Sequence, residues 1–314
     1  MEIIASCDSS LVKYSRPIGS NPTSAVHVPR RLDAPTHKDE VPAMRWSASP
    51  LPRTYFPDHA QNRMQSEGDL LAAHNEFLAK HPKNLQLLLK NRYSWMKKYI
   101  KPDSIVVEIG AGSGFSKQFV EREILLTEIF PHPWIDICVD AADMPFGLET
   151  IDVVICANVL HHLGKPLKFL LDLHMCLKPG GYVLINEANP SFLFLLAVRT
   201  MRHEGWSFDV DVFDLSAPVN DPADPWSGNN AVSYLMFHES RAFQENVRGF
   251  EVVHDGFAEC LMLPLSGGVT AKTKTVELPM TVLKIVDWLD RKLCRLSPQV
   301  FAMRRSVALR KRSV

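Results

Sequence analysis

Residues 106–115 read Val-Val-Glu-Ile-Gly-Ala-Gly-Ser-Gly-Phe, a β-branched run followed by a turn with three glycines. A glycine-rich turn after a strand lets a ligand approach the backbone closely, because no side chain blocks it. Two phosphate-binding patterns are excluded: a nicotinamide fingerprint requires glycine where this chain has Phe115, and a P-loop requires Gly-Lys followed by Ser or Thr. The carboxylate of Glu108, just before the turn, is unfavourable beside a pyrophosphate but suits a cationic ligand such as a sulfonium.

Outward from this turn, short apolar runs alternate with helical patterns. This alternation predicts an α/β fold with a doubly wound, mostly parallel sheet that has helices on both faces. The expected strands are residues 105–109, 124–127, 135–139, 151–156, 182–186, 250–253 and 307–309. The expected helices of this part are residues 115–123, 166–177 and 281–296.

The chain divides into five segments by composition. Residues 1–60 contain eight prolines and are expected to be irregular or disordered, with aromatic side chains near their end that offer contacts with the body. Residues 61–100 predict N-terminal helices, and residues 101–187 predict the ligand-binding core. Residues 188–248 are acidic and aromatic, which favours an inserted lid over the site. Residues 249–314 are expected to supply closing strands and a basic amphipathic helix.

The formal net charge of zero results from two parts of unequal length whose opposite charges cancel. Residues 291–314 hold eight basic residues and no acid, so the preceding residues carry an excess of acid. Zero net charge argues against a general nucleic-acid binder. The longest apolar run, residues 192–198, is far shorter than the ~20 residues of a membrane-spanning helix, and no secretory signal is expected. No two cysteines lie close enough for a zinc or redox pair, so a cytoplasmic location is expected.

Five sequence blocks together resemble the class I S-adenosylmethionine-dependent methyltransferases, in particular the type 11-like branch. The blocks occur in that family's order and cover about residues 100–190. They are residues 108–114, 140–146 (Asp-Ala-Ala-Asp-Met-Pro-Phe), 151–154, 158–163 (Asn-Val-Leu-His-His-Leu) and 177–181. The resemblance implies a Rossmann-like fold with a seven-stranded sheet, methyltransferase activity, and S-adenosyl-L-methionine as the cofactor. It implies no metal ion.

The resemblance assigns the first cofactor contacts to the glycine-rich turn and the next strand. Gly110, Gly112 and Gly114 would shape the loop under the methionine part, with Glu108 near its amino-acid end. Glu128 would accept hydrogen bonds from both ribose hydroxyls, because it ends the second strand 20 residues after Glu108. A solvated acid at a strand end is the alternative interpretation of Glu128.

Further cofactor contacts follow along the same sheet edge. Asp140 and Ala141 match the positions that meet the adenine in the family, and Asn158 follows the fourth strand, at the carboxyl edge where open α/β sheets bind ligands. The family usually has a short helix before Ile135, but two prolines exclude a helical turn here. The sequence therefore predicts a short loop with Ile129 or the next residue, Phe130, against the adenine.

A general base is expected at the same edge if the acceptor is a hydroxyl. Correct positioning of the reactants supplies on the order of 7–11 kcal/mol of the barrier, and a base near neutral pH adds to it. His161 and His162 are the candidates, although one of them could instead cap or pack the loop. His132, His203 and His238 are weaker candidates, and an acid of the insertion is another possibility.

The C-terminal region permits two interpretations. Apolar residues form one helical stripe, and basic residues lie mostly off it. The stripe is Val282, Val286, Leu289, Leu293 and Leu296; the basic residues are Lys284, Arg291, Lys292 and Arg295. Residues 281–314 could bind an anionic membrane surface or a phosphorylated substrate. Alternatively, the helix covers the domain and its basic end is simply solvated.

The acceptor is the least determined feature of the sequence. The chain also resembles bacterial methyltransferases associated with surface-polysaccharide assembly, which implies O-methylation of a glycan or glycolipid intermediate at the cytoplasmic membrane face. A small soluble or quinone-like metabolite is the alternative acceptor, and a non-catalytic cofactor-binding scaffold is an alternative of another class. No nucleic-acid partner is expected, and the oligomeric state stays open.

Overall fold

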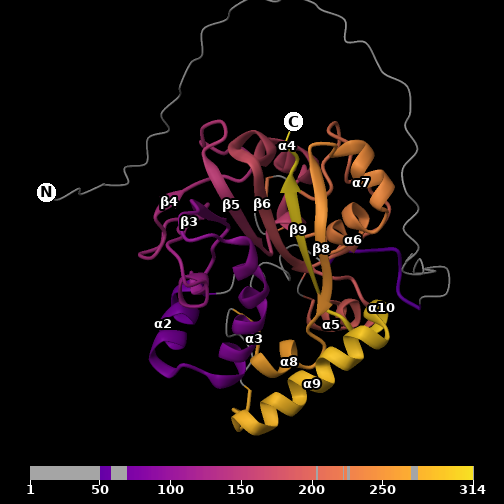
Figure 1. Cartoon of the computed structure of the whole chain (residues 1–314). Coiled ribbons are helices and arrows are strands. Elements are labelled where there is room, and N and C mark those ends of the chain that lie inside the picture. Colours follow the sequence, from indigo (N-terminus) through magenta and orange to yellow (C-terminus); the bar gives the residue numbers. More distant parts are fainter. Residues whose placement is uncertain are drawn as a thin grey trace, which may run out of the picture. The chain divides into compact units, whose positions relative to one another are not determined.

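The fold was derived from a computed structural model (Figure 1), which describes residues 50–57, 69–202, 204–221, 223–224, 227–269 and 275–313. The central sheet of the described residues has seven strands in the order β4-β3-β2-β5-β6-β9-β8. Their bounds are β2 Val106–Ile109, β3 Leu125–Glu128, β4 Ile137–Cys138, β5 Ile151–Ala157, β6 Leu177–Ala188, β8 Phe250–Ala258 and β9 Arg304–Lys311. Strand β9 runs antiparallel to β6 and β8, and the other pairs are parallel. The predicted α/β class with a mostly parallel sheet is confirmed.

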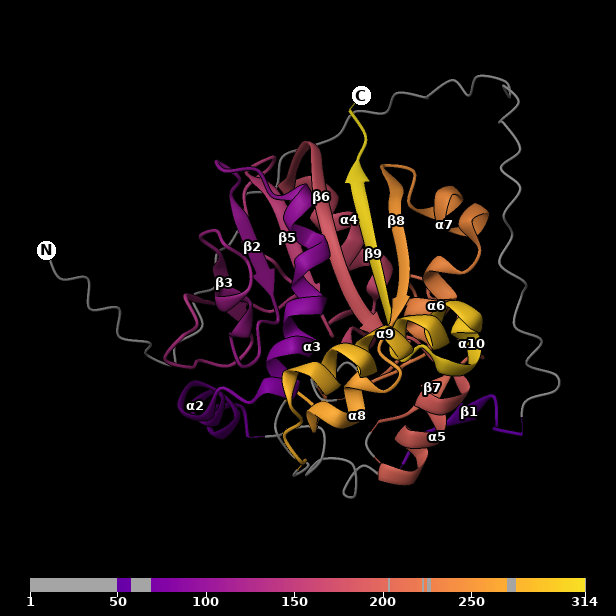
Figure 2. The same cartoon turned by 60° about the horizontal axis from the view of Figure 1, so that its bottom comes forward.

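Helices cover both faces of the sheet, as Figure 2 shows for α3 and α9 in front and α4 behind. The helices are α2 Leu70–Lys80, α3 Lys83–Ser94, α4 Pro166–Cys176, α5 Phe192–Met201, α6 Val232–Phe237, α7 Ser240–Asn246, α8 Met262–Ser266, α9 Met280–Leu296 and α10 Pro298–Phe301. Successive side chains of β5 point to opposite faces. Val154 and Cys156 pack with α4, α6 and α7, whereas Val153 and Ile155 pack with α2 and α3. The sheet is therefore buried on both sides.

Several element boundaries differ from the predicted ones, among them the end of β8 and the start of β9. The helix expected over residues 115–123 is only a 3-10 turn, η3 (Phe115–Gln118), because Glu121, Arg122 and Glu123 are exposed and gain no packing that would hold another turn. Strand β4 is shorter than the alternating pattern suggested. Strand β6 begins at Leu177, before the expected strand start, since Leu177 already pairs with Ile151 of β5.

Part of the proline-rich segment is ordered. Residues 1–49 and 58–60 lie outside the described residues, but Thr54–Tyr55 form strand β1. This strand pairs antiparallel with β7, Trp206–Ser207, which belongs to the insertion. The ring of Tyr55 lies 4.8 Å from that of Trp206, and the Trp206 indole N–H donates to the Pro52 carbonyl. Thr54 and Tyr55 thus form a short strand in a segment expected to be mostly irregular, and Tyr55 makes one of the aromatic contacts expected near the end of that segment.

Helix α9 buries a different face from the one that carries its apolar stripe. Its buried positions are Leu283, Asp287, Asp290 and Cys294. The Asp290 carboxylate accepts hydrogen bonds from three backbone N–H groups at residues 260–262, at distances of 2.7–2.9 Å. The stripe itself is half-buried or exposed. In the described part of the chain, no helix is both long and apolar enough to cross a membrane.

Candidate functional site

A cavity of about 1560 Å³ opens at the carboxyl edge of the sheet. Its walls come from the ends of β2, β3, β5 and β6, from the start of β9, and from α5 and the segment after β8. Most predicted site residues line this cavity and are thus brought together from distant parts of the sequence. They are Glu108, Gly110, Gly112, Glu128, Ile129, Asp140, Ala141, Asn158, His161 and His162.

The three glycines of the turn have different roles. All have positive φ: 66° at Gly110, 52° at Gly112 and 70° at Gly114. A Cβ at Gly110 would lie 2.7 Å from the Val159 side chain, and one at Gly114 would lie 2.4 Å from the Trp134 ring. At Gly112 an added Cβ would meet no atom closer than 4.0 Å. Gly112 is therefore the position where a ligand can reach the backbone, whereas Gly114 does not line the cavity and makes room for Trp134.

Trp134 supports the loop that replaces the family's usual helix. Its indole N–H donates to the Gly112 carbonyl at 2.8 Å, and its ring stacks on His74 at 3.8 Å between centroids. Ile129 and Phe130 of the same loop line the cavity, and each is about two-fifths exposed. The contact of one of them with the adenine stays a prediction. The structural role of Trp134 was not foreseen, because its partners lie far away in the sequence.

Glu108 is buried at the start of the turn. Its carboxylate accepts hydrogen bonds from the Ser116 hydroxyl and, at 3.3 Å, from the Tyr93 hydroxyl. Burial raises its pKa to about 7, although these two hydrogen bonds oppose the shift. The group can thus change its charge near neutral pH, and a cation placed beside it would favour the carboxylate.

Two further acids of the cavity are oriented by backbone N–H groups. The Glu128 carboxylate accepts from Gly112 and Ile129, both at 2.8 Å. The Asp140 carboxylate accepts from Ala142 at 2.8 Å. Because a carboxylate has about four acceptor positions, both groups keep capacity for the hydroxyl or amine donors of a ligand.

Asn158 is held by the last strand of the sheet. It adopts a left-handed φ of 62° directly after β5, and its side-chain oxygen accepts a hydrogen bond from Arg304 of β9. The Arg304 Nε lies 3.4 Å from Glu259, which makes a buried two-bond ion pair with Arg92 at 2.6 and 2.7 Å. Burial and the neighbouring charge of Arg92 lower the pKa of Arg304 to about 10. No sequence pattern indicated this pairing, because it joins α3, β9 and the residue after β8.

His161 forms ion pairs with two carboxylates. Its Nδ1 lies 2.6 Å from Glu187, and its Nε2 lies 3.4 Å from Glu204. The other oxygen of Glu187 accepts from the backbone N–H groups of Val159 and Leu160 at 2.6 and 2.7 Å, which fixes the carboxylate. Glu187 follows the predicted strand 182–186 directly, so its position as an acid at a strand end could have indicated it. Glu204 comes from the insertion and had no such signal.

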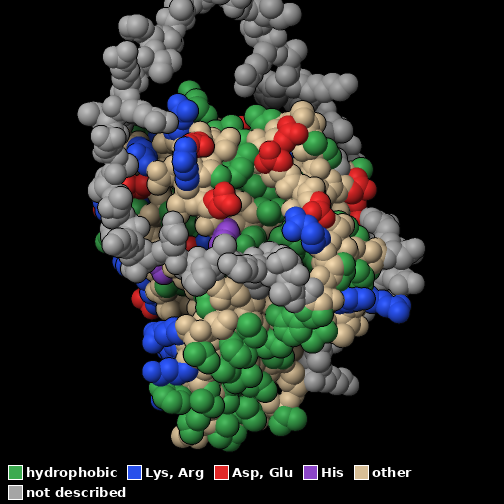
Figure 3. Space-filling view, turned by 90° about the vertical axis from the view of Figure 1, so that its right-hand side faces the viewer, with side chains coloured by type: hydrophobic (Ala, Val, Ile, Leu, Met, Phe, Trp, Pro, Cys, Tyr) green, Lys and Arg blue, Asp and Glu red, His purple; other side chains and the backbone are tan. Residues whose placement is uncertain are grey.

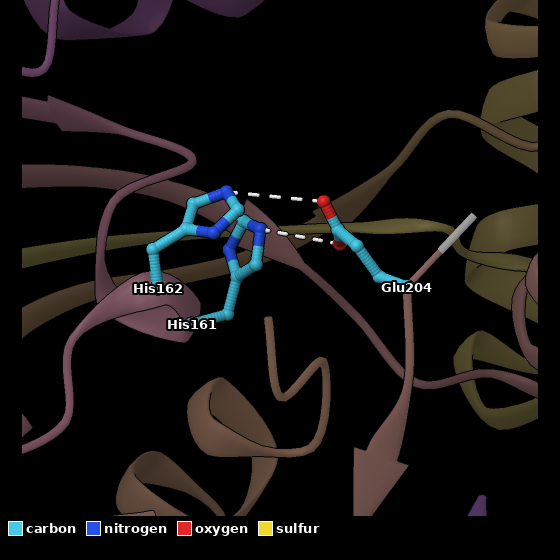
Figure 4. Close-up of side chains that lie close together, drawn as sticks. All are labelled: His161, His162 and Glu204. Carbon is cyan, nitrogen blue, oxygen red and sulfur yellow. Dashed lines mark ion pairs between the residues drawn. The ribbon is translucent and has the colours of Figure 1, made fainter. Parts of the chain in front are cut away.

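His162 lies beside His161, and Figure 4 shows both Nε2 atoms turned towards Glu204. The ring centroids are 4.1 Å apart, and the His162 Nε2 lies 3.8 Å from the nearer Glu204 oxygen. The His162 Nδ1 lies 3.1 Å from the Ser227 carbonyl, so this nitrogen carries the proton and donates it. Since the ligand atoms of these two histidines and Glu204 all lie within 4.8 Å of one another, the group could also hold a metal ion.

The two histidines differ in protonation at neutral pH. Burial alone would lower the pKa of His161, but the carboxylates of Glu187 and Glu204 outweigh it and raise that pKa to about 10. Burial and the positive charge of His161 lower the pKa of His162 to about 4. His161 is therefore an imidazolium, and His162 is neutral with a lone pair on Nε2.

The weaker histidine candidates do not line the cavity. His132 stacks on Trp134 at 4.9 Å between ring centroids. His238 stacks on Tyr234 at 4.3 Å. Neither belongs to the cavity wall. His203 lies outside the described residues.

Curated relatives match this chain over limited parts. The hybrid PKS-NRPS synthetase lepA of Aspergillus flavus is 28% identical over 204 residues, which cover 57% of this chain and 5% of that protein. Tenellin synthetase of Beauveria bassiana is 30% identical over 113 residues, or 36% of this chain and 3% of that protein. The chain thus spans about one twentieth or less of the length of these relatives.

Solved structures and a family model complete the comparison. A SAM-dependent methyltransferase from Archaeoglobus fulgidus is 18% identical, with a TM-score of 0.45 over 71% of this chain and 93% of that chain. One from Mesorhizobium loti is 15% identical, with a TM-score of 0.39 over 70% of this chain and 97% of that chain. Residues 74–254, more than half of the chain, match the model of a methyltransferase domain family. The chain therefore belongs to the S-adenosylmethionine-dependent methyltransferases, as the five sequence blocks implied, and S-adenosylmethionine is its cofactor.

Proposed function

We propose that this enzyme methylates an acidic carbon or hydroxyl of an acceptor that carries a long apolar group. The observation that carries the proposal is the pair His161 and His162, which lie in one cavity but differ in protonation, His161 being cationic and His162 neutral. Neighbouring titratable groups whose pKa values are pushed apart are typical of an acid–base arrangement. In this arrangement His162 accepts the acceptor's proton, and His161 stabilises the negative charge that remains.

The cavity residues fit the cofactor. Gly112 presents open backbone, Glu108 is an acid beside the turn, and Glu128 and Asp140 have acceptor oxygens to spare. The bound cofactor supplies a methyl group on a sulfonium, whose departure needs no acid. The chain's own residues are then required only to position the acceptor and to take one proton from it.

The proton acceptor is the His162 Nε2. Its Nδ1–H is committed to the Ser227 carbonyl, which leaves the Nε2 lone pair facing the cavity beside Glu204. As the bond between the methylated substrate and the methyl group forms, the O–H or C–H bond of that substrate breaks and its proton moves to the His162 Nε2. The new positive charge on His162 is offset by the Glu204 carboxylate. The His161 imidazolium, anchored by Glu187, stabilises the charge that develops on the acceptor.

The low pKa of His162 favours an acidic acceptor. A base with a pKa of about 4 removes a proton efficiently only when the acceptor is itself acidic. A carbon between two carbonyl groups, an enol or a phenol meets this condition better than a sugar hydroxyl does. The names of the relatives, a hybrid PKS-NRPS synthetase and a tenellin synthetase, support a polyketide-like acyl chain as the acceptor.

The cavity wall supports an apolar acceptor. Helix α5 contributes Phe194, Val198 and Met201, and the segment after β8 contributes Leu263 and Val269. Burying an acyl chain against such side chains is favourable by roughly 25 cal/mol for each Å² of apolar surface removed from water. These apolar side chains therefore suit the hydrocarbon chain of the proposed acceptor.

A glycan or glycolipid acceptor is the second candidate. The acids Glu204 and Asp224 line the same cavity, and carboxylates can accept hydrogen bonds from sugar hydroxyls. A glycolipid would also use the apolar wall. Substrate trials therefore need β-keto acyl thioesters, phenols or quinols, and lipid-linked glycans side by side.

The test is methyl transfer from isotopically labelled S-adenosylmethionine to this acceptor panel, with products identified by mass spectrometry. We expect His162→Gln to lower kcat by about 100-fold or more while calorimetry shows unchanged cofactor binding. The control is His132→Gln, which removes a histidine that stacks on Trp134 outside the cavity wall. Full turnover by His162→Gln would refute the assigned base. Methylation of glycans alone would replace the acyl acceptor with the second candidate.

A further inference from the structure

Helix α9 turns an apolar face towards solvent. Ile285, Trp288 and Leu296 are 60%, 58% and 77% exposed, and Val282 and Leu289 are about two-fifths exposed. Figure 3 shows hydrophobic side chains gathered over the lower part of the molecule, where α5, α9 and α10 lie, with Lys and Arg side chains along one edge. Contiguous exposed apolar patches of this kind mark interaction sites.

This orientation is fixed by polar contacts of the opposite face. The Asp290 carboxylate binds the backbone N–H groups that precede and begin α8, and Asp287 accepts from the Asn91 side chain at 2.8 Å. Rotating α9 to bury its apolar stripe would break these contacts and leave two carboxylates without their partners. The apolar face therefore stays outward in the folded enzyme.

The exposed charge beside this face is positive. Lys284, Arg291, Lys292 and Arg295 are all exposed, whereas the two acids of α9 are buried. The basic residues of β9 behave differently, because they form ion pairs within the body: Arg305 with Asp255, Lys311 with Glu149, Arg304 with Glu259 and Arg310 with Glu251. On α9, Arg291 is paired with the Asp287 carboxylate, which leaves Lys284, Lys292 and Arg295 as the exposed cations that this helix offers to a partner.

The same surface continues to the cavity. Leu193 of α5, Leu293 of α9 and Phe301 of α10 all pack against the buried cluster of Cys260, Cys294 and Ala302, which joins the three helices. Helix α5 exposes Leu196 by 40% and Met201 by 52%, and Met201 also lines the cavity. The exposed apolar surface therefore extends from α9 to α5, and α5 also lines the cavity.

We propose that α9 and the exposed side of α5 dock on the surface of an anionic lipid bilayer. Ile285, Trp288 and Leu289 enter the boundary between headgroups and acyl chains, while the basic residues of α9 bind lipid phosphates. The bilayer then delivers the acceptor past Met201 into the cavity. This last step rests on the proposed function, whereas the docking itself does not.

Charge complementarity distinguishes a bilayer from a second copy of the chain. In an antiparallel pairing of two α9 helices about a two-fold axis, the basic edges of both copies would lie on the same side and repel each other. An anionic bilayer instead presents negative charge along the whole edge. The combination of an exposed tryptophan, aliphatic side chains and adjacent lysines and arginines is typical of helices that lie in the membrane interface.

The test is co-sedimentation of the full chain with vesicles, without cofactor or acceptor. We expect binding to vesicles of phosphatidylcholine with phosphatidylglycerol, weaker binding at high salt, and little binding to phosphatidylcholine alone. Ile285→Ser combined with Trp288→Ser should weaken binding about tenfold or more. Lys284→Gln, Lys292→Gln and Arg295→Gln together should remove the preference for anionic lipid.

Matched controls keep the result interpretable. Leu148→Ser changes a residue that is 69% exposed outside α5 and α9, and it should bind like the unmodified enzyme. Circular dichroism and thermal melting check that each variant is folded. The proposal is overturned if the unmodified enzyme does not bind anionic vesicles, or if the double variant binds unchanged. It is also overturned if sedimentation equilibrium shows a dimer that Trp288→Ser dissociates. A failed methylation assay with intact vesicle binding would reject the proposed function alone.

Discussion

The carboxyl of Glu108 couples cofactor binding to pH. Its pKa of about 7 in the free enzyme is set by burial. The group is neutral below that pH and ionised above it, and a bound cation favours the ionised form. The pKa should therefore fall when the cofactor binds, and binding should release a proton.

We predict that the affinity for S-adenosylmethionine rises from pH 6 to pH 7 by up to about tenfold and levels off above it. Calorimetry across this range measures the affinity, and buffers of different ionisation enthalpy measure the released proton. Glu108→Gln should bind more weakly and lose this pH dependence. Retention of the dependence in Glu108→Gln would assign it to another group.

Glu187 sets the charge of His161. Replacing it by Gln keeps an oxygen that can accept from Val159 and Leu160 but removes one of the two negative charges on the imidazolium. We predict that the pKa of His161 falls, which NMR titration of the histidine ring measures. The stabilisation from His161 is complete below its unfolded pKa of about 6.5 and is lost as pH rises through about 10. In Glu187→Gln this loss should still begin near pH 6.5 but be complete at lower pH; an unchanged titration would exclude Glu187 as its cause.

Among the elements, the glycine-rich turn uses one glycine to leave room for a ligand and another to leave room for a packed side chain. Gly112→Ala introduces a side chain where only a ligand would be, with a left-handed backbone cost of about 1–2 kcal/mol. Gly114→Ala carries the same cost and also drives a methyl group into Trp134, which adds about 1–3 kcal/mol of overpacking. We predict that Gly112→Ala mainly weakens cofactor binding and Gly114→Ala mainly lowers thermal stability. Calorimetry and thermal melting of both variants decide this; equal loss of stability would contradict it.

Sequence periodicity predicted the strands well where burial is continuous. The apolar run 151–156 forms most of β5, and both faces of this strand are covered by other elements. For the helix at 281–296, periodicity predicted the extent but left open whether the apolar stripe faces outward or covers the domain. An apolar stripe indicates which face prefers burial, but the contacts of Asp287 and Asp290 decided the rotation, and these partners lie far away in the sequence.

The site was partly predictable for the same reason. Residues that follow a strand directly, such as Glu128 and Asn158, were found because every parallel strand delivers its end to one edge. Glu204 and Arg304 were missed, because the insertion and the antiparallel strand reach that edge by tertiary packing. Trp134 was missed as well. Its ring fits only because Gly114 has no side chain, and the sequence analysis assigned Gly114 to cofactor binding.

For the whole molecule, the basic C-terminal region is mainly a part of the sheet. Strand β9 lies between β6 and β8, and Val307, Ala308 and Leu309 are buried. We predict that a chain ending at Asp290 does not fold, because the two neighbouring strands of β9 would each lose a partner. Circular dichroism and thermal melting of this truncation test the prediction. A cooperative melt near that of the full chain would show that β9 is dispensable.

The position of β9 also sets the order of events during synthesis. Among the strands of the sheet β9 is translated last, yet it occupies an interior position and brings Arg304 to Asn158 at the cavity. Until residues 304–311 have left the ribosome, β8 has no neighbour that links it to β6. The nascent chain therefore holds two exposed strand edges, and both remain open to mispairing until β9 has been synthesised.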